Sequence, residues 1–199
     1  MKRRPKLMPE FKARQGLVQP NQTERRWATP LRMARHVVED TAKRVEALNS
    51  LGVLYIHTKR YDEAVTALKE ASGEVLNRAP WLAFGNLGWA YTEQGQYDLA
   101  EEALKRALFD QPQFCVGLYR LGNVCYLTSR YEEARDYLEQ AIGITEGGCD
   151  RLQEAHHLLG MTLLRLDAVD DAIAAFDTCV NIAPKTPMGM DCAAVRRDL

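Results

Sequence analysis

The chain has 199 residues, of which 46% are apolar and 27% are charged, and its formal net charge is −1. This composition is typical of a chain that folds around an apolar core, and it excludes a wholly disordered protein. Residues 1–36 hold ten Lys or Arg and two acids, so the remaining residues carry a net charge of −9. An acidic body is repelled by phosphate groups, and nucleic acid is therefore not expected as the main partner.

The first segment, residues 1–28, is expected to be a basic, disordered and solvated leader; the alternative is a basic arm that contacts nucleic acid or anionic lipid. It begins Met1-Lys2-Arg3-Arg4, like a secretory signal, but Pro, Lys and Glu interrupt the apolar stretch that should follow. Nowhere does the sequence reach the roughly 18 to 20 apolar residues that a membrane span requires.

Residues 29–199 are dominated by an internal repeat, which is marked by four Leu-Gly pairs. The glycines are Gly52, Gly88, Gly122 and Gly160, at spacings of 36, 34 and 38 residues. Alanine follows each glycine by twelve residues, at Ala64, Ala100, Ala134 and Ala172. A bulky apolar residue follows by sixteen, at Leu68, Leu104, Leu138 and Phe176. Small residues let two helices approach closely, and the bulky residues fill the space between them, so each unit is predicted to be a helix hairpin.

The helices are therefore expected in pairs along the chain. The predicted pairs are 42–58 with 61–76, 81–94 with 97–110, 115–128 with 131–144, and 152–166 with 169–182. They belong to repeats at about 45–80, 81–114, 115–152 and 153–186. A further helix is expected at 31–40, and a capping helix is expected within 187–199, since a solenoid needs closed ends.

This pattern resembles the tetratricopeptide repeat, and the resemblance extends over about residues 45–184. The second unit matches the family motif most fully, through Phe84, Leu87, Gly88, Tyr91, Ala100, Leu104, Ala107 and Pro112. The resemblance implies an all-α, right-handed superhelix of at least four repeats with a C-terminal capping helix. It also implies a non-enzymatic scaffold that binds another protein.

In this family, certain positions of the first helix of each repeat (helix A) line a concave groove. Carried over to this chain, the expected partner-binding residues are Val53, Ile56, Trp89, Tyr119, Asn123, Tyr126, His157, Met161 and Leu164. Trp and Tyr are the residue types enriched at binding hot spots. Two alternatives remain open: these aromatic side chains pack in the core, or the chain's own tail fills the groove.

A known subfamily of these repeats binds the C-terminal carboxylate of chaperones through Lys, Asn and Arg. Of the corresponding positions in this chain, Asn86 and Arg120 fit, whereas Asn49, Val53 and Val116 do not supply the expected side chains. Chaperone-tail recognition is therefore not expected.

The five cysteines allow two interpretations. Adjacent A helices start side by side, so Cys115 and Cys149, the latter in a glycine-rich insertion, are candidates for a disulfide. Cys179 and Cys192 form a second candidate pair, and Cys125 is expected to be a buried thiol. Two pairs are typical of an exported protein, whereas in the cytosol all five residues would be small apolar side chains.

The sequence offers no recognisable catalytic or metal-binding motif. His156 and His157 are adjacent and therefore point in different directions on a helix. Zinc-protease, nucleophile-elbow and phosphate-loop signatures are absent. No enzymatic activity, cofactor or metal is expected.

A narrower resemblance is carried by Trp81, the run Gly88 to Tyr91, the run Asp110 to Cys115, and Ile182-Ala183-Pro184 with Cys192 beyond it. These residues resemble the repeat pilotins of type IV pilus machines, which are outer-membrane lipoproteins. The resemblance implies a protein at the periplasmic side of the outer membrane, which binds an amphipathic segment of a secretin and promotes secretin insertion and ring formation. A monomer is expected, as the default for a capped solenoid. Membrane association is expected only through a lipid anchor that this sequence does not contain. The alternative is a cytoplasmic adaptor that uses the same groove on a soluble protein.

Overall fold

The computed structural model describes residues 22–199, with side chains described for Met33 and for residues 39–199. Residues 1–21 of the predicted disordered leader lie outside the described residues, whereas residues 22–28 are helical and not disordered. By its packing the chain divides into residues 1–43 and residues 44–199, and the repeats belong to the second unit. Residues 22–199 contain helices and no strand, so the predicted all-α class is confirmed.

The first helix differs from the prediction. We expected one helix at 31–40 and another at 42–58, but α1 runs without a break from Gln22 to His57. The predicted boundary between them fell at Thr41. However, neither Gly nor Pro occurs between Leu31 and Leu51, so no residue forces the helix to end there.

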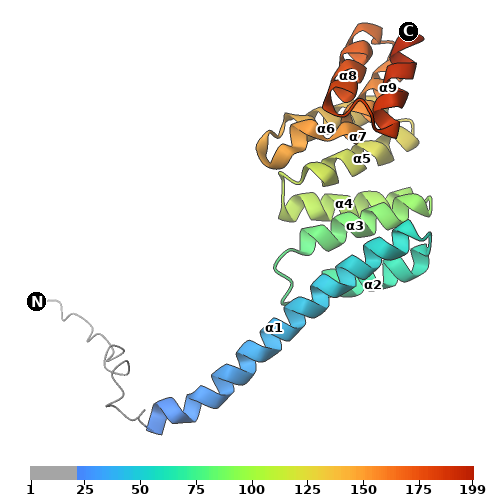
Figure 1. Ribbon diagram of the computed structural model, residues 1–199. Coiled ribbons are helices and arrows are strands. Elements are labelled where there is room, and N and C mark those ends of the chain that lie inside the picture. Colours follow the sequence, from blue (N-terminus) through green and yellow to red (C-terminus); the bar gives the residue numbers. More distant parts are fainter. Residues whose placement is uncertain (1–21) are drawn as a thin grey trace, which may run out of the picture. The chain divides into compact units, whose positions relative to one another are not determined.

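Residues 44–199 form the predicted stack of helix hairpins (Figure 1). The last part of α1 pairs in sequence with α2 (Tyr61–Gly73). The next three hairpins are α3 (Pro80–Glu93) with α4 (Tyr97–Asp110), α5 (Cys115–Leu127) with α6 (Tyr131–Gly143), and α7 (Gln153–Arg165) with α8 (Val169–Ile182). A 3-10 turn, η2 (Glu146–Arg151), precedes α7, and α9 (Pro187–Arg197) follows α8. The predicted solenoid of at least four repeats with a C-terminal cap is confirmed.

The repeated glycine explains how closely the two helices of a hairpin approach. A Cβ atom on Gly88 would lie 2.5 Å from Cγ of Leu104, and one on Gly122 would lie 2.9 Å from Cγ of Leu138. In each case the contact is the apolar residue sixteen positions later, as the pattern indicates. Leu104 and Leu138 are fully buried, so each one occupies the space that a glycine leaves on the facing helix.

The turns between paired helices share one backbone conformation. Seven residues after each repeat glycine, φ is positive: 59° at Lys59, 72° at Gly95, 62° at Ser129 and 59° at Asp167. Only glycine adopts this left-handed region without strain, so in three of the four turns the residue at this position has an unfavourable backbone conformation. The helix that follows each turn nevertheless begins at the equivalent position, because the packing of the hairpin fixes it.

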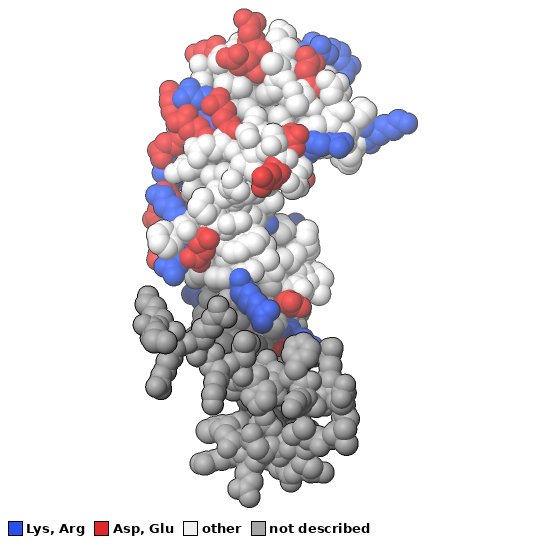
Figure 2. Space-filling model, turned by 90° about the vertical axis from the view of Figure 1, so that its left-hand side faces the viewer, with Lys and Arg blue, Asp and Glu red and all other residues white. Residues whose placement is uncertain are grey.

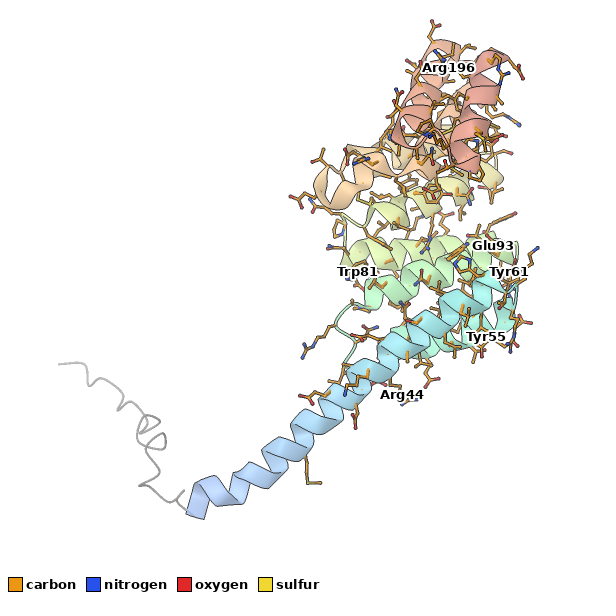
Figure 3. The ribbon with its side chains drawn as sticks, viewed as in Figure 1. Arg44, Tyr55, Tyr61, Trp81, Glu93 and Arg196 are labelled. Carbon is orange, nitrogen blue, oxygen red and sulfur yellow. A yellow bond between two sulfur atoms is a disulfide. The ribbon has the colours of Figure 1, made fainter. Side chains whose placement is uncertain are left out.

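The C-terminal cap is held by polar contacts and a disulfide. The Thr186 hydroxyl accepts a hydrogen bond from the backbone N–H of Gly189, at 3.0 Å, and so caps the start of α9. Gln153 of α7 donates to the carbonyl oxygens of Cys179, at 2.8 Å, and Ala183, at 3.1 Å. Arg196 of α9 pairs with Asp177 of α8; Arg196 is labelled in Figure 3. These contacts close the last hairpin and cover its core.

Candidate protein-binding surface

The predicted binding residues lie on the A helices, which are the second half of α1, then α3, α5 and α7. We call the partly exposed side chains on these helices the A-helix face. Eight of the nine predicted residues are half-buried and belong to it: Val53, Trp89, Tyr119, Asn123, Tyr126, His157, Met161 and Leu164. That a partner binds along this face stays a prediction.

Ile56 is the exception, and its prediction as a surface residue is corrected here. Its side chain is 3% exposed and lies in the core cluster with Leu68 and Leu87. Thr92, at the equivalent position of the second repeat, is also buried, and its hydroxyl donates to the Gly88 carbonyl oxygen at 2.8 Å. In the first two repeats this position therefore faces the core, and Ile56 contributes to packing.

Trp89 of α3 is fixed from three sides. Its indole Nε1–H donates to Oε1 of Glu93 at 3.1 Å, and the ring of His57 meets it edge-on at a centroid distance of 5.2 Å. The guanidinium of Arg120, on α5, lies 4.9 Å from the indole centroid, within the range of a cation–π contact. Glu93 also accepts a hydrogen bond from Tyr61 of α2 at 3.5 Å, and both residues are labelled in Figure 3. The ring is thus held in one orientation before any partner arrives.

A chain of polar side chains crosses the A helices beside Trp89. Arg120 donates from Nη1 to Oδ1 of Asn86 at 2.9 Å, and Asn86 in turn donates from Nδ2 to Oδ1 of Asn49 at 3.0 Å. Among the described residues, no carboxylate lies within ion-pair distance of Arg120. Burial lowers the pKa of Arg120 to about 10, because the protein shields the charge from water. The sequence singles out Asn86 and Arg120, but it does not predict their contact with each other or with Trp89.

More aromatic side chains continue the surface toward α7. Burial raises the pKa of the Tyr119 hydroxyl, and the nearby charge of Glu154 adds to this effect. Tyr126 packs edge-on against Tyr131 at 5.6 Å, and the guanidinium of Arg165 lies 4.7 Å from the Tyr131 ring centroid. The face therefore combines rigid rings with cations, a composition that suits a protein segment better than a small molecule.

The C-terminal cap takes up one end of this face. Nε2 of His157 lies 2.9 Å from Oδ2 of Asp191 in α9. Met161 and Leu164 pack against the core cluster that contains Cys192 of α9. The chain's own end thus contacts His157, while the contacts of Trp89 within the described residues come from α1, α3 and α5.

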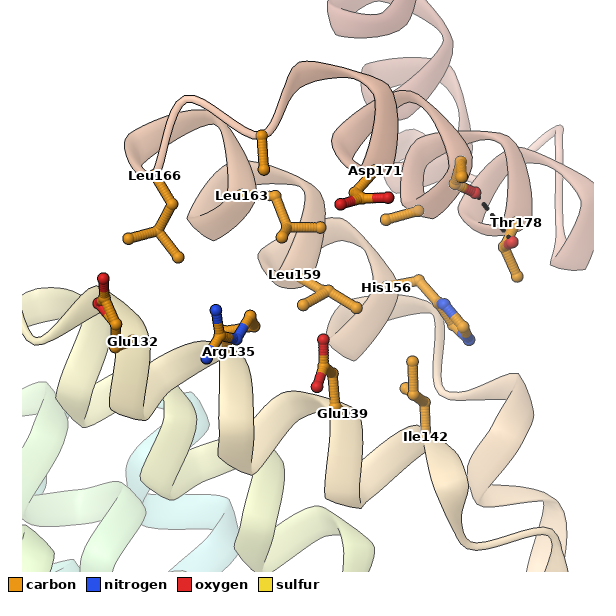
Figure 4. A pocket seen from close by; sticks show the side chains of 13 residues that line it. Glu132, Arg135, Glu139, Ile142, His156, Leu159, Leu163, Leu166, Asp171 and Thr178 are labelled. Atoms are coloured by element: carbon orange, nitrogen blue, oxygen red, sulfur yellow. Dashed lines mark hydrogen bonds between the residues drawn. The ribbon is translucent and has the colours of Figure 1, made fainter.

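A cavity lies elsewhere, between α6 and α8 (Figure 4). It has a volume of about 700 Å³, an apolar floor that includes Leu159 and Leu163 of α7, and acidic residues at its edge such as Glu132 and Glu139. A cavity of about 660 Å³ lies in the equivalent place between α2 and α4, beside α3. Because the gap recurs between successive second helices, it follows from the repeat, and we do not take it as a dedicated ligand site. Figure 2 shows one side of the molecule, on which uncharged residues cover much of the middle repeats and charged residues lie mainly toward one edge.

The structure contains both disulfides considered from the sequence. Cys115 and Cys149 are joined with their Cα atoms 5.9 Å apart, and Cys179 and Cys192 with theirs 6.3 Å apart, both normal for disulfides. Cys149 is brought to the start of α5 by the preceding glycines of η2, which have φ of 68° and 78°. Cys125 is a free thiol with no exposed surface, and burial raises its pKa to about 11, so it is a poor nucleophile.

The described residues hold no group of three or more His, Cys, Asp or Glu placed to bind a metal ion. In residues 22–199, no helix has both the length and the apolarity that crossing a bilayer requires.

Stacked helix hairpins with a partly exposed aromatic face define an α-solenoid of the kind that binds other proteins. The chain belongs to the tetratricopeptide-repeat family. Models of this repeat match residues 45–73 and 83–108 in the first half and residues 114–185 in the second, which together make up more than half of the chain.

Solved structures share this fold at low sequence identity. MamA superposes with a TM-score of 0.60 at 21% identity, over 84% of this chain and 98% of MamA. PilF of Pseudomonas aeruginosa gives a TM-score of 0.66 at 19% identity, over 78% of this chain and 70% of PilF. PilW, described as a widely conserved type IV pilus biogenesis factor, gives 0.63 at 23% identity, over 75% of this chain and 67% of PilW. At these identities the likeness shows the fold alone.

Among curated proteins, an uncharacterized protein of Guillardia theta, ycf37, is 32% identical over 45% of this chain and 52% of its own length. The chloroplast repeat protein PYG7 of Arabidopsis thaliana is 28% identical over 45% of this chain and 30% of its own length. The chain thus spans about half or less of the curated relatives it matches.

Proposed function

We propose that this protein is a non-enzymatic pilotin that binds secretin subunits through its A-helix face. Binding would promote their insertion into the outer membrane and their assembly into a ring for type IV pilus biogenesis and pilus-dependent motility. The observation that carries the proposal is the set of ring side chains on this face, namely Trp89, Tyr119 and Tyr126, which are half-buried and held by neighbouring side chains.

The physical role of this face is to shield an apolar surface during transport. An amphipathic secretin segment exposes apolar side chains until the ring forms, and such surfaces aggregate in water. A helix lying on the A-helix face would cover those side chains with Trp89, Tyr119 and Tyr126 in a helix-in-groove mode. Trp89 alone is expected to contribute about 2 kcal/mol to the complex, as buried Trp anchors do.

Two further observations support this proposal. Both disulfides suit an oxidising compartment such as the periplasm, and we propose the periplasmic side of the outer membrane as the location. The fold is also shared with PilF and PilW, the second of which is described as a pilus biogenesis factor.

The second candidate is a cytoplasmic adaptor that binds a soluble protein through the same face. The fold is shared also with MamA and with the repeat domain of Sgt2 from Aspergillus fumigatus, neither of which is described as a pilus protein, so the fold is equally compatible with this alternative. The two candidates differ in the state of the cysteines. Titration of thiols in chain taken directly from its native host, denatured without reductant, should find one thiol per chain for the periplasmic protein and five for the cytoplasmic one.

The binding proposal is tested by co-purifying secretin subunits with tagged chain variants. Trp89→Ala should weaken secretin recovery by about tenfold or more, whereas Trp89→Phe should retain most of it, because a ring remains. Phe109→Ala is the matched control, since Phe109 is a 78% exposed aromatic residue on α4 and does not belong to the A-helix face. If the wild-type chain recovers no secretin, or if Trp89→Ala and Phe109→Ala recover equal amounts, the proposed function is wrong.

A further inference from the structure

Arg120 is a cation to which the described part of the chain offers no anionic partner. Other arginines of the chain pair with carboxylates: Arg130 lies 2.5 Å from Glu101, and Arg60 lies 2.8 Å from Glu63. Arg120 is half-buried, yet its hydrogen-bond partner is the neutral side-chain oxygen of Asn86. A shielded charge without a counter-charge is unfavourable, and an arginine in this state is poised to receive an anion.

The guanidinium is also held ready in one orientation. Asn86 fixes Nη1, and Asn86 is itself fixed by Asn49. The indole of Trp89 lies 4.9 Å from the guanidinium carbon. A guanidinium has five N–H donors, and the contact with Asn86 uses one of them, so donors remain for a carboxylate. Such charge-assisted pairs are about twice as strong as neutral hydrogen bonds.

The neighbouring residues decide which kind of carboxylate fits. Val53 and Val116 are aliphatic and Asn49 is neutral, so these positions offer no second cation for the chain-terminal carboxylate of a peptide tail. Burial is the main cause of the raised Tyr119 pKa, and the charges of Glu154 and Glu93 add to it, so both carboxylates lie close to this part of the face. They would repel further acids in the partner. A single acidic side chain with apolar neighbours satisfies both conditions.

We propose that Arg120 selects an internal Asp or Glu in the bound segment, by pairing with its carboxylate while Trp89 and Tyr119 cover apolar residues beside it. This inference rests on the proposed binding role of the A-helix face, and it adds the chemistry of the partner. The segment it specifies is amphipathic and has one acid on its apolar side, not an acidic tail.

The test is a peptide selection, which works whichever protein supplies the natural segment. A phage-displayed library of random 16-residue peptides is panned on the full chain and, in parallel, on Arg120→Met and Arg106→Met. Arg106 is the matched control, because its guanidinium also lies against a ring, 5.8 Å from the centroid of Phe84, but it is exposed and lies on α4, outside the A helices. Wild type and Arg106→Met should enrich peptides that carry one Asp or Glu among apolar residues, and Arg120→Met should not.

A selected peptide then allows a double-mutant cycle, in which the affinity is measured for each pair of peptide and chain variants. Replacing its acid with the corresponding amide should weaken binding to wild type at least tenfold, and binding to Arg120→Met less than twofold. Amidation of the peptide's C-terminus should change affinity less than twofold, since the internal carboxylate is the one bound. Thermal unfolding verifies that the variants fold. If Arg120→Met does not fold, Arg120→Lys takes its place. This variant should weaken binding of the acid-bearing peptide more than binding of its amide counterpart, because lysine lacks the planar guanidinium that pairs with a carboxylate.

Several results would overturn the inference: no selected peptide, enriched peptides without an acid, the same acid preference on both arginine variants, or loss of binding on C-terminal amidation. Failure of secretin recovery alone would refute the proposed partner but would leave the selection result intact. Conversely, secretin bound equally well by wild type and Arg120→Met would refute the role of Arg120 and leave the proposed function standing.

Discussion

Replacing Gly88 with alanine tests the packing that builds every repeat. A methyl group at this position would lie 2.5 Å from Cγ and 2.8 Å from Cδ2 of Leu104, and 3.2 Å from the carbonyl oxygen of Ala100. Leu104 is fully buried, so the methyl group would compete with its side chain for the same space. The Ala100 carbonyl oxygen belongs to the backbone and cannot rotate away, so we expect α3 and α4 to move apart.

The expected magnitude is the difference of two effects. Forcing an extra methyl group into a packed core destabilises by about 1 to 3 kcal/mol, and the contacts at Gly88 are short enough to place it near the upper value. Alanine in place of glycine within a helix stabilises by about 1 kcal/mol. We therefore expect Gly88→Ala to lower the free energy of unfolding by about 2 kcal/mol. Gly122→Ala should cost less, because its nearest contact, to Leu138, is 2.9 Å.

Gly143→Ala is the control. Gly143 ends α6, and a Cβ atom placed on it would meet no atom within 4 Å. This substitution should leave the free energy of unfolding unchanged or raise it by up to about 1 kcal/mol. Urea unfolding followed by circular dichroism, with the disulfides intact, measures all three variants. If Gly88→Ala were as stable as Gly143→Ala, the close approach of α3 to α4 would not be needed, and this account of the repeat would be wrong.

Three other predictions follow from the turns, the cap and the ion pairs. Ser129→Gly should raise the free energy of unfolding by about 1 kcal/mol, because φ at this position is 62°. If urea unfolding shows no gain in stability, Ser129 is not strained in this turn. Replacing Cys179 and Cys192 together with serine should destabilise the chain by about 3 kcal/mol and increase amide hydrogen exchange in α9 more than in α4. The Glu101 pKa is lowered mainly by its hydrogen bond from Arg130, so the stability that its charge provides is present at neutral pH and lost on acidification. The free energy of unfolding of wild type should therefore exceed that of Glu101→Gln by up to about 1 kcal/mol at pH 7. If urea unfolding showed the same difference at pH 3, the ion pair of Glu101 with Arg130 would not be its cause.

The hairpins could be predicted from the sequence because every repeat has the same pair of contacting positions. The glycine of helix A and the residue sixteen positions later contact each other in every unit, from Gly52 with Leu68 to Gly160 with Phe176. Because this pair occurs four times at similar spacing, it predicts the hairpin in each repeat. The continuity of α1 could not be found this way, since residues 22–44 lie before the first repeat glycine, Gly52, and before the first match to the repeat at residue 45.

The exposure of individual positions was predicted less well, for a physical reason. Ile56 and Tyr126 occupy the same place in their repeats, four residues after the glycine, yet Ile56 is buried and Tyr126 is half-exposed. Ile56 lies in a core cluster that includes Leu87 of the next hairpin, whereas the ring of Tyr126 packs edge-on against Tyr131 of its own hairpin. The contact of Arg120 with Asn86 likewise joins residues 34 positions apart, so no local pattern reveals it.

Fold likeness alone does not choose between the candidate functions, because MamA, PilF and PilW superpose on the same helices at 19 to 23% identity. The choice must rest on side chains that the fold does not require. A solenoid needs its glycines, alanines and leucines to stack, but packing alone does not require a half-buried arginine without a described carboxylate beside it, and a residue such as leucine would be more favourable there for stability. Proteins hold such unfavourable groups mainly where binding uses them. Arg120 and Trp89 together are therefore the residues from which the partner of this chain should be sought.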